Sequence, residues 1–154
     1  MTDDILVVAL VACSSRKLPH PAQARDLYQG QLFKAVRAYV EAKGWPWHIL
    51  SARYGLVDPD EVLEPYDHVL GDAAAWTAGV WQALLRRYSP DRATRFCFFA
   101  GKRYRLRLMT LIHASPPWQA CAPLAGYGYA QQVAWLRNGL IVHNKKAPPR
   151  PTIS

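Results

Sequence analysis

Apolar and polar positions follow one another along the chain in blocks that predict strands and helices in turn. Residues 5–12 form an unbroken apolar run, which is short enough for a strand and suits one that is covered on both faces. Residues 47–51, 95–100 and 118–122 predict three further strands. Pro19 and Pro21 follow the first strand, so the chain leaves that strand through a loop.

Apolar residues at helical spacing lie between these strands. From Leu32 they recur at i+1, i+4, i+7 and i+8, and Gly44 is predicted to end that helix. Asp72 is predicted to cap a second helix, and Gly101 to open a third. A last helix is expected near the end of the chain. The side chains on its inward face are predicted to be Tyr129, Val133 and Leu136.

Strands that alternate with helices predict an α/β fold. We expect a mostly parallel sheet of about four strands with helices on both faces, in a single three-layer domain over residues 1–147. Residues 148–154 are rich in proline and predict an extended tail. A length of 154 residues suits one domain.

Charge is distributed unevenly and changes the functional picture. The net charge is +8, and eight cations fall within residues 86–107 against one acid. Residues 58–72 hold six of the eleven acids. A segregated positive charge is typical of nucleic-acid binding, although solubility and a coding bias toward arginine give a similar composition.

The loop after the first strand carries most of the candidate chemistry. Cys13 and Ser14 come directly after the strand, and Lys17 follows them at a position where it could bind a phosphate. Cys13 is either an inert buried thiol or a nucleophile, and Lys17 is either solvated or an anion ligand. Asp26 is either a helix N-cap or a carboxylate that orients water, and Tyr28 can stack on a base or wall off a pocket.

Further candidate groups follow the second strand. Ser51 can bind a base edge, and Tyr54 can stack on a base or pack beneath its own loop. The long connection over residues 57–71 is either a solvated loop or the source of a general acid or base. The candidates on these two segments that we expect to touch substrate are Ser51, Arg53, Tyr54, Glu64, Tyr66 and Asp67.

The segment after the third strand is a further candidate for contacts with phosphate. It is either an ordinary solvated helix face or, with Gly101 at a helix N-terminus, a phosphate site. The side chains expected to contact a DNA backbone are Lys102, Arg103, Arg105 and Arg107.

No metal or cofactor is expected. The three cysteines include no Cys-x-x-Cys pair, and the five histidines lack metal-ligand spacing. The pattern of a nucleotide-binding Gly-x-x-x-x-Gly-Lys loop is absent. The acidic start of the chain does not resemble an export signal, and no apolar run could span a bilayer, so we expect a cytoplasmic protein with no membrane contact and no evident protein partner.

A set of short motifs resembles a bacterial and phage family often labelled YaaA-like. They are Cys13-Ser-Ser-x-Lys17, Pro21-Ala-x-Ala-x-Asp26-Leu-Tyr28, Leu32-Phe33, Leu50-Ser-Ala-x-Tyr54-Gly-Leu-Val57, Glu64-Pro-Tyr66-Asp67, Pro123-Leu-x-Gly-x-Gly and Trp135-Leu136. The first loop is similar to one in archaeosine synthase, and the layout is similar to the uracil-DNA glycosylase fold. The chain lacks the Gly-Gln-Asp-Pro-Tyr-His and His-Pro-Ser motifs of true uracil glycosylases.

The resemblance implies a DNA glycosylase that acts on a modified, phage-type cytosine in anti-phage defence. In that hypothesis the enzyme flips a nucleotide out of DNA and cleaves its N-glycosidic bond without a cofactor. Asp26 and Lys17 are the expected catalytic residues. Two alternatives stay open: an enzyme that modifies a base or nucleoside, for instance in tRNA, and a non-catalytic DNA-binding stress protein.

Overall fold

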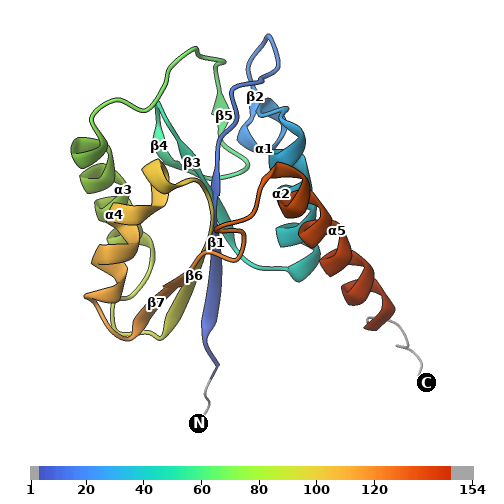
Figure 1. Cartoon of the computed structure of the whole chain (residues 1–154). Helices are drawn as coiled ribbons and strands as arrows, with labels where there is room; N and C mark the ends of the chain where they lie inside the picture. The colour runs from blue at the N-terminus through green and yellow to red at the C-terminus, as the bar shows by residue number, and fades with distance from the viewer. Residues whose placement is uncertain (1–3, 147–154) are drawn as a thin grey trace.

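The structure, a computed structural model, describes residues 4–146 and centres on a five-stranded sheet (Figure 1). The strand order is β4-β3-β1-β6-β7. The four predicted strands are confirmed and run parallel to one another, whereas the fifth, β4, is antiparallel. The strands are β1 (Leu6–Ala12), β3 (Trp47–Ser51), β4 (Gly55–Val57), β6 (Thr94–Phe99) and β7 (Trp118–Cys121).

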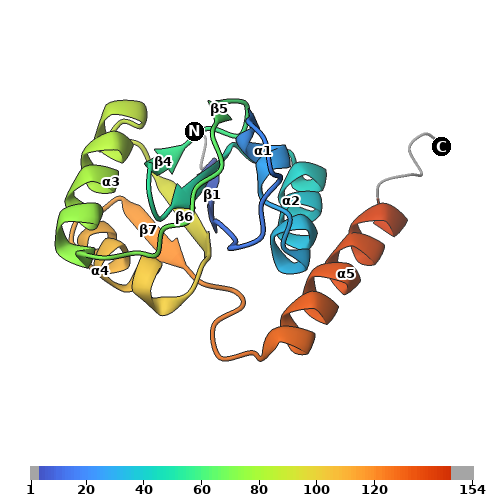
Figure 2. The same ribbon diagram turned by 90° about the horizontal axis from the view of Figure 1, so that it is seen from above.

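Helices cover both faces of the sheet, as the alternating pattern predicts. Helices α2 (Gln31–Lys43) and α5 (Tyr129–Lys146) lie on one face. Helices α3 (Ala73–Arg87) and α4 (Lys102–His113) lie on the other, and Figure 2 shows the three layers from above. The domain is therefore a three-layer α/β sandwich.

Strand β1 lies at the centre of both hydrophobic cores. Ala9 and Val11 pack into the core beneath α2 and α5, whereas Val8 and Leu10 pack into the core beneath α3 and α4. All four are at most 1% exposed. Alternate side chains of a strand point to opposite faces, so an unbroken apolar run is what a strand buried on both sides requires.

Most of the expected helix ends are confirmed. Gly44 ends α2 in the left-handed conformation at φ 72°. The carboxylate of Asp72 accepts hydrogen bonds from the amides of Ala74 and Ala75 at the start of α3. Gly101 is the N-cap of α4.

Four expectations about local structure were wrong. Asp26 does not cap the long helix but lies inside a short helix, α1 (Ala24–Leu27), and α2 begins after Gly30. The loop expected at residues 52–56 includes the start of β4. The acidic connection holds β5 (Val62–Leu63), which pairs with β2 (Ala22–Gln23). Tyr129, expected to face inward, is 55% exposed, because it begins α5 beyond the edge of the sheet. The tail at 148–154 lies outside the described residues.

The topology has a switch point between β1 and β6. The chain leaves β1 through α2 to reach β3 on one side, whereas it leaves β6 through α4 to reach β7 on the other side. The two connections diverge from the carboxyl ends of adjacent strands. In open α/β sheets, ligands bind in the crevice at such a point.

Candidate functional site

Five of the predicted site residues come together beside the carboxyl ends of β1 and β3. We call them the tyrosine cluster: Lys17, Tyr28, Ser51, Tyr54 and Tyr66. The Tyr66 hydroxyl lies 2.8 Å from both the Tyr28 hydroxyl and the Ser51 Oγ. Tyr54 and Tyr66 meet edge to face, with ring centroids 5.4 Å apart. Tyr66 therefore links segments that are far apart in the sequence.

Lys17 covers this cluster with a positive charge. Its Nζ lies 4.2 Å from the centroid of the Tyr66 ring and 5.8 Å from that of Tyr28. The backbone holds it there, because Lys17 and Tyr28 form an isolated antiparallel bridge. This placement of Nζ over two aromatic rings is a cation–π arrangement.

The position of Ser51 is fixed by backbone and side-chain contacts. Its Oγ accepts hydrogen bonds from the amides of Arg53 and Tyr54, and its carbonyl accepts one from the Trp76 indole at 2.8 Å. The guanidinium of Arg53 lies 5.5 Å from the centroid of the Tyr54 ring. Ser51 itself is fully buried, so the turn after β3 presents a rigid hydroxyl to Tyr66.

Burial sets the chemistry of the two buried tyrosines. Desolvation raises the pKa of Tyr66, and the same cause raises the pKa of Tyr28. Both hydroxyls therefore keep their protons near neutral pH. Tyr66, which is only partly buried, can donate a hydrogen bond to a bound group, whereas Tyr28 is fully buried. Both are poorly suited to act as phenolate bases.

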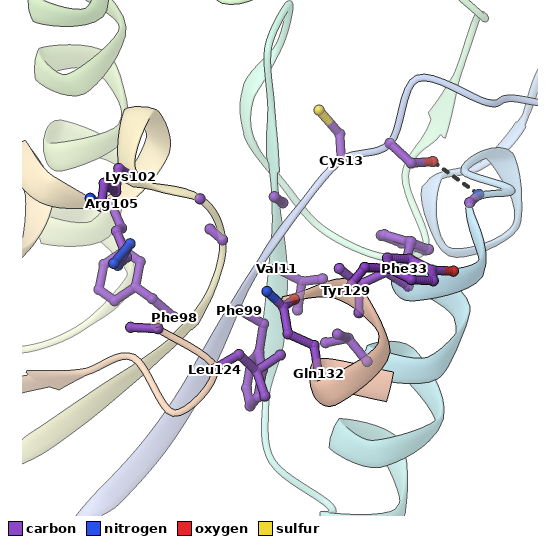
Figure 3. Close-up of a pocket in the computed structure, with 18 of the residues that line it drawn as sticks. Val11, Cys13, Phe33, Phe98, Phe99, Lys102, Arg105, Leu124, Tyr129 and Gln132 are labelled. Atoms are coloured by element: carbon purple, nitrogen blue, oxygen red, sulfur yellow. Dashed lines mark hydrogen bonds between the residues drawn. The ribbon is translucent and has the colours of Figure 1, made fainter. Parts of the chain in front are cut away.

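A cavity of about 490 Å³, which we call the strand-end pocket, opens at the switch point. Apolar side chains from the sheet, α2 and the turn before α5 form much of its wall, among them Val11, Phe33, Phe99 and Leu124. Cys13 and Ser14 line it from the loop after β1. Figure 3 shows Lys102 and Arg105 on one side of the pocket, opposite Phe33, Tyr129 and Gln132.

Arg105, which is expected to contact a DNA backbone, does not lie on the solvated face of α4. Only 9% of its surface is exposed, and its side chain lines the strand-end pocket. Its guanidinium has no hydrogen-bond or ion-pair partner within residues 4–140. The sequence contains a signal for the inward position of Arg105. Arg105 lies three residues before Leu108 and seven before Ile112, so all three share one helix face, and Leu108 and Ile112 are fully buried.

The basic stretch over residues 86–107 does not form one patch. Lys102 and Arg103 lie at the carboxyl edge of the sheet, where α4 begins, and Arg103 donates to the carbonyl of Leu70 at 2.8 Å. Arg107 is exposed one turn further along α4. Residues 86–95 span the end of α3 and the start of β6, at the opposite edge. Only the second half of the stretch can therefore serve the strand-end pocket.

The predicted acids lie apart from the tyrosine cluster. The Asp26 carboxylate is paired with Arg37 of α2 at 2.9 Å, and its side chain is 50% exposed. Glu64 and Asp67 are exposed. None of these three lines the strand-end pocket, and the lining residues that the structure describes include no aspartate, glutamate or histidine.

Two residues that the sequence analysis missed, Tyr104 and Gly30, contact the loop after β1 at Cys13 and Ser14. The Cys13 Sγ lies 3.7 Å from the hydroxyl of Tyr104, which packs edge to face on Trp76 at 5.4 Å. Gly30 also lines the pocket, next to Ser14. A Cβ at position 30 would lie only 2.9 Å from the Ser14 Cβ, so a larger residue would clash there. The Gly30 amide donates to the Ser14 Oγ, so the loop after β1 packs directly on the start of α2.

The residues described here hold no group of three or more acidic, histidine or cysteine side chains that could bind a metal ion. Within the same residues, no helix is long and apolar enough to cross a membrane.

Fold and site define a three-layer α/β protein with a pocket at its topological switch point. The chain belongs to a family of unknown function, DUF6884, whose sequence model matches residues 8–138. No curated protein and no solved structure matches the chain.

Proposed function

We propose that the protein is a DNA glycosylase that removes a modified, phage-type cytosine, such as glucosylated hydroxymethylcytosine, as a defence against phage. The observation that carries the proposal is the convergence of Lys17, Tyr28, Ser51 and Tyr66 at one edge of the sheet. These residues are separated in the sequence, yet the hydroxyls of Tyr28, Ser51 and Tyr66 are hydrogen-bonded to one another and Lys17 lies over the Tyr66 ring. The motifs of these residues resemble the YaaA-like family, and some members of that wider group look like anti-phage DNA glycosylases, which supports the same proposal.

The chemistry of the cluster fits the departure of a base. Hydrolysis of an N-glycosidic bond adds the hydroxyl of water to C1′ and transfers a proton to the leaving base. The Tyr66 hydroxyl, which keeps its proton, can donate a hydrogen bond to the negative charge that builds on that base. The Lys17 ammonium adds a positive charge on the same side.

Asp26 is the proposed carboxylate for water or for the cationic sugar. It lies two residues before Tyr28, and in the free protein its partner is Arg37. The proposal also places the enzyme in the cytoplasm, which the three free thiols support.

The test uses two DNAs, one from a phage that carries glucosylated hydroxymethylcytosine and one unmodified. The proposal predicts base release and alkali-labile sites from the modified DNA alone, detected by mass spectrometry and strand cleavage. Asp26→Asn should abolish both signals. Tight, salt-sensitive binding to both DNAs with no release from either would contradict catalysis and point to a DNA-binding protein.

A second candidate is an enzyme that modifies a base or nucleoside, for instance in tRNA, without excision. It is favoured by one observation, the lack of a carboxylate among the described residues that line the strand-end pocket. This candidate predicts a covalent adduct on Cys13 or Lys17, which denaturing mass spectrometry of the protein after incubation with tRNA would detect.

A further inference from the structure

Arg105 carries a charge that nothing in the described part of the protein neutralises. Its side chain is 9% exposed, and no acid lines the pocket into which it faces (Figure 3). A guanidinium that lines a pocket without an acid can form charge-assisted hydrogen bonds with a bound anion. An anion in the strand-end pocket would supply the missing partner.

The start of α4 provides donors at the same place. Its N-cap, Gly101, has no side chain that could accept from the first amides of the helix. Gly101 and Lys102 line the pocket together with Arg105. The free amides of a helix start carry partial positive charge and favour phosphate oxygens. The 12-residue helix thus adds main-chain donors to two cationic side chains.

The remainder of the pocket suits an organic group attached to that anion. Phe33, Phe99 and Leu124 offer apolar surface, and Gln31 and Gln132 offer amide groups at its edge. A volume of about 490 Å³ lies in the range of small-molecule sites. A phosphate on one side and a flat, partly polar ring on the other is the chemistry of a single nucleotide.

We infer that the strand-end pocket binds one nucleotide unit and that Arg105, Lys102 and the start of α4 hold its phosphate. The inference rests on the proposed function for the nature of the attached base. Arg105 is a binding residue here, not a catalytic one. The same phosphate chemistry is present in a free nucleotide and in a DNA strand, and the probes below separate these two sources.

The test measures binding by calorimetry for four probes: inorganic phosphate, deoxycytidine 5′-monophosphate, deoxycytidine and a short single-stranded oligodeoxynucleotide. We expect Arg105→Gln to weaken binding of the monophosphate about tenfold or more, and to leave the weaker binding of deoxycytidine unchanged. Arg86→Gln removes the same charge from the exposed end of α3 at the opposite edge. It should change binding of the monophosphate less than twofold.

Each outcome decides the inference. If the oligonucleotide alone binds, and Arg105→Gln weakens it, the phosphate belongs to a DNA strand. Equal affinity of wild type and Arg105→Gln for all probes would overturn the inference. If Arg105→Gln does not fold, Lys102→Gln takes its place with the same expectation. Wild-type protein that binds neither phosphate, monophosphate nor oligonucleotide would also overturn it.

Base release from modified DNA, measured on the same variants, separates this inference from the proposed function. Loss of monophosphate binding in Arg105→Gln, in a protein that releases no base from any DNA, leaves the phosphate site in place and rejects the glycosylase. Full base release by Arg105→Gln with unchanged binding rejects the phosphate site and leaves the glycosylase in place.

Discussion

The hydroxyl of Tyr66 lies 2.8 Å from the Oγ of Ser51 and 2.8 Å from the hydroxyl of Tyr28. Tyr66 comes from the acidic connection, whereas Ser51 ends β3 and Tyr28 follows α1. One side chain thus ties three segments together at the carboxyl edge of the sheet, next to the strand-end pocket.

Tyr66→Phe should destabilise the protein by about 1–3 kcal/mol, because it removes the hydrogen-bond partner of a buried hydroxyl. Tyr28 is fully buried and loses that partner. Urea unfolding measures the change. Tyr54→Phe is the matched control, since the ring of Tyr54 is 41% exposed, and it should cost less than about 0.5 kcal/mol. Equal effects of the two changes would contradict the role given to Tyr66.

Lys17→Met should weaken DNA binding and reduce its salt dependence, because one cation is lost from the proposed contact surface. We expect the slope of log affinity against log salt to fall by about one, as measured by fluorescence anisotropy. Lys43→Met provides the control. Lys43 also packs over aromatic rings, those of Tyr39 and Trp45, but it lies at the far end of α2. An identical salt slope for wild type and Lys17→Met would exclude a phosphate contact at Lys17.

The protein should lose stability as pH falls below about 6.5, the ordinary pKa of histidine. Burial lowers the pKa of His48 in the folded protein, so the unfolded chain takes up its proton first. The Nδ1 of His48 lies 2.7 Å from the Oδ1 of Asp58. The pKa of Asp58 is also lowered, through hydrogen bonds with Arg87 and His48 that outweigh its desolvation. The stability that Asp58 contributes is therefore lost only below about pH 4.

Urea unfolding between pH 7.5 and pH 5 tests this dependence, which has a limiting slope of about 1.4 kcal/mol per pH unit for one proton. His48→Gln should flatten the curve in that range. His113→Gln changes an exposed histidine on α4 and should leave the curve as in wild type. A His48→Gln curve as steep as that of wild type would assign the dependence to another group.

Cys121 should react with iodoacetamide at neutral pH, because its pKa is lowered to about 7. The main cause is the thiol of Cys97, whose Sγ lies 3.1 Å from that of Cys121 on the neighbouring strand. Cys97→Ala removes this hydrogen-bond partner and should slow alkylation of Cys121 at pH 7, measured by mass spectrometry. Alkylation at an unchanged rate would show that Cys97 does not activate Cys121.

The sequence predicts those parts of the fold that depend on local signals. The apolar run of β1, the end of α2 at Gly44 and the Asp72 cap are each encoded within a few residues, and the structure confirms them. The short strands β4 and β5 were missed, because pairs of two or three residues depend on a partner elsewhere in the chain.

The site was predicted only in part, because some of its contacts follow from the topology and others depend on how distant segments pack. Parallel strands bring their carboxyl ends to one edge, so the meeting of Tyr28 with Ser51 follows from the topology. The inward position of Arg105 was not predicted, although its helical spacing from Leu108 indicates the buried face. The pairing of Asp26 with Arg37 depends on how α1 packs on α2, and no pattern in the sequence reports that contact.

The most direct test of the central claim is the single-turnover rate of base release from glucosylated phage DNA. We expect Tyr66→Phe and Asp26→Asn to slow release about 100-fold or more, since each removes a group proposed to stabilise the transition state. Lys43→Met should release base at the wild-type rate. Wild-type rates for both site variants, in folded proteins, would place the activity outside this edge of the sheet and contradict the account.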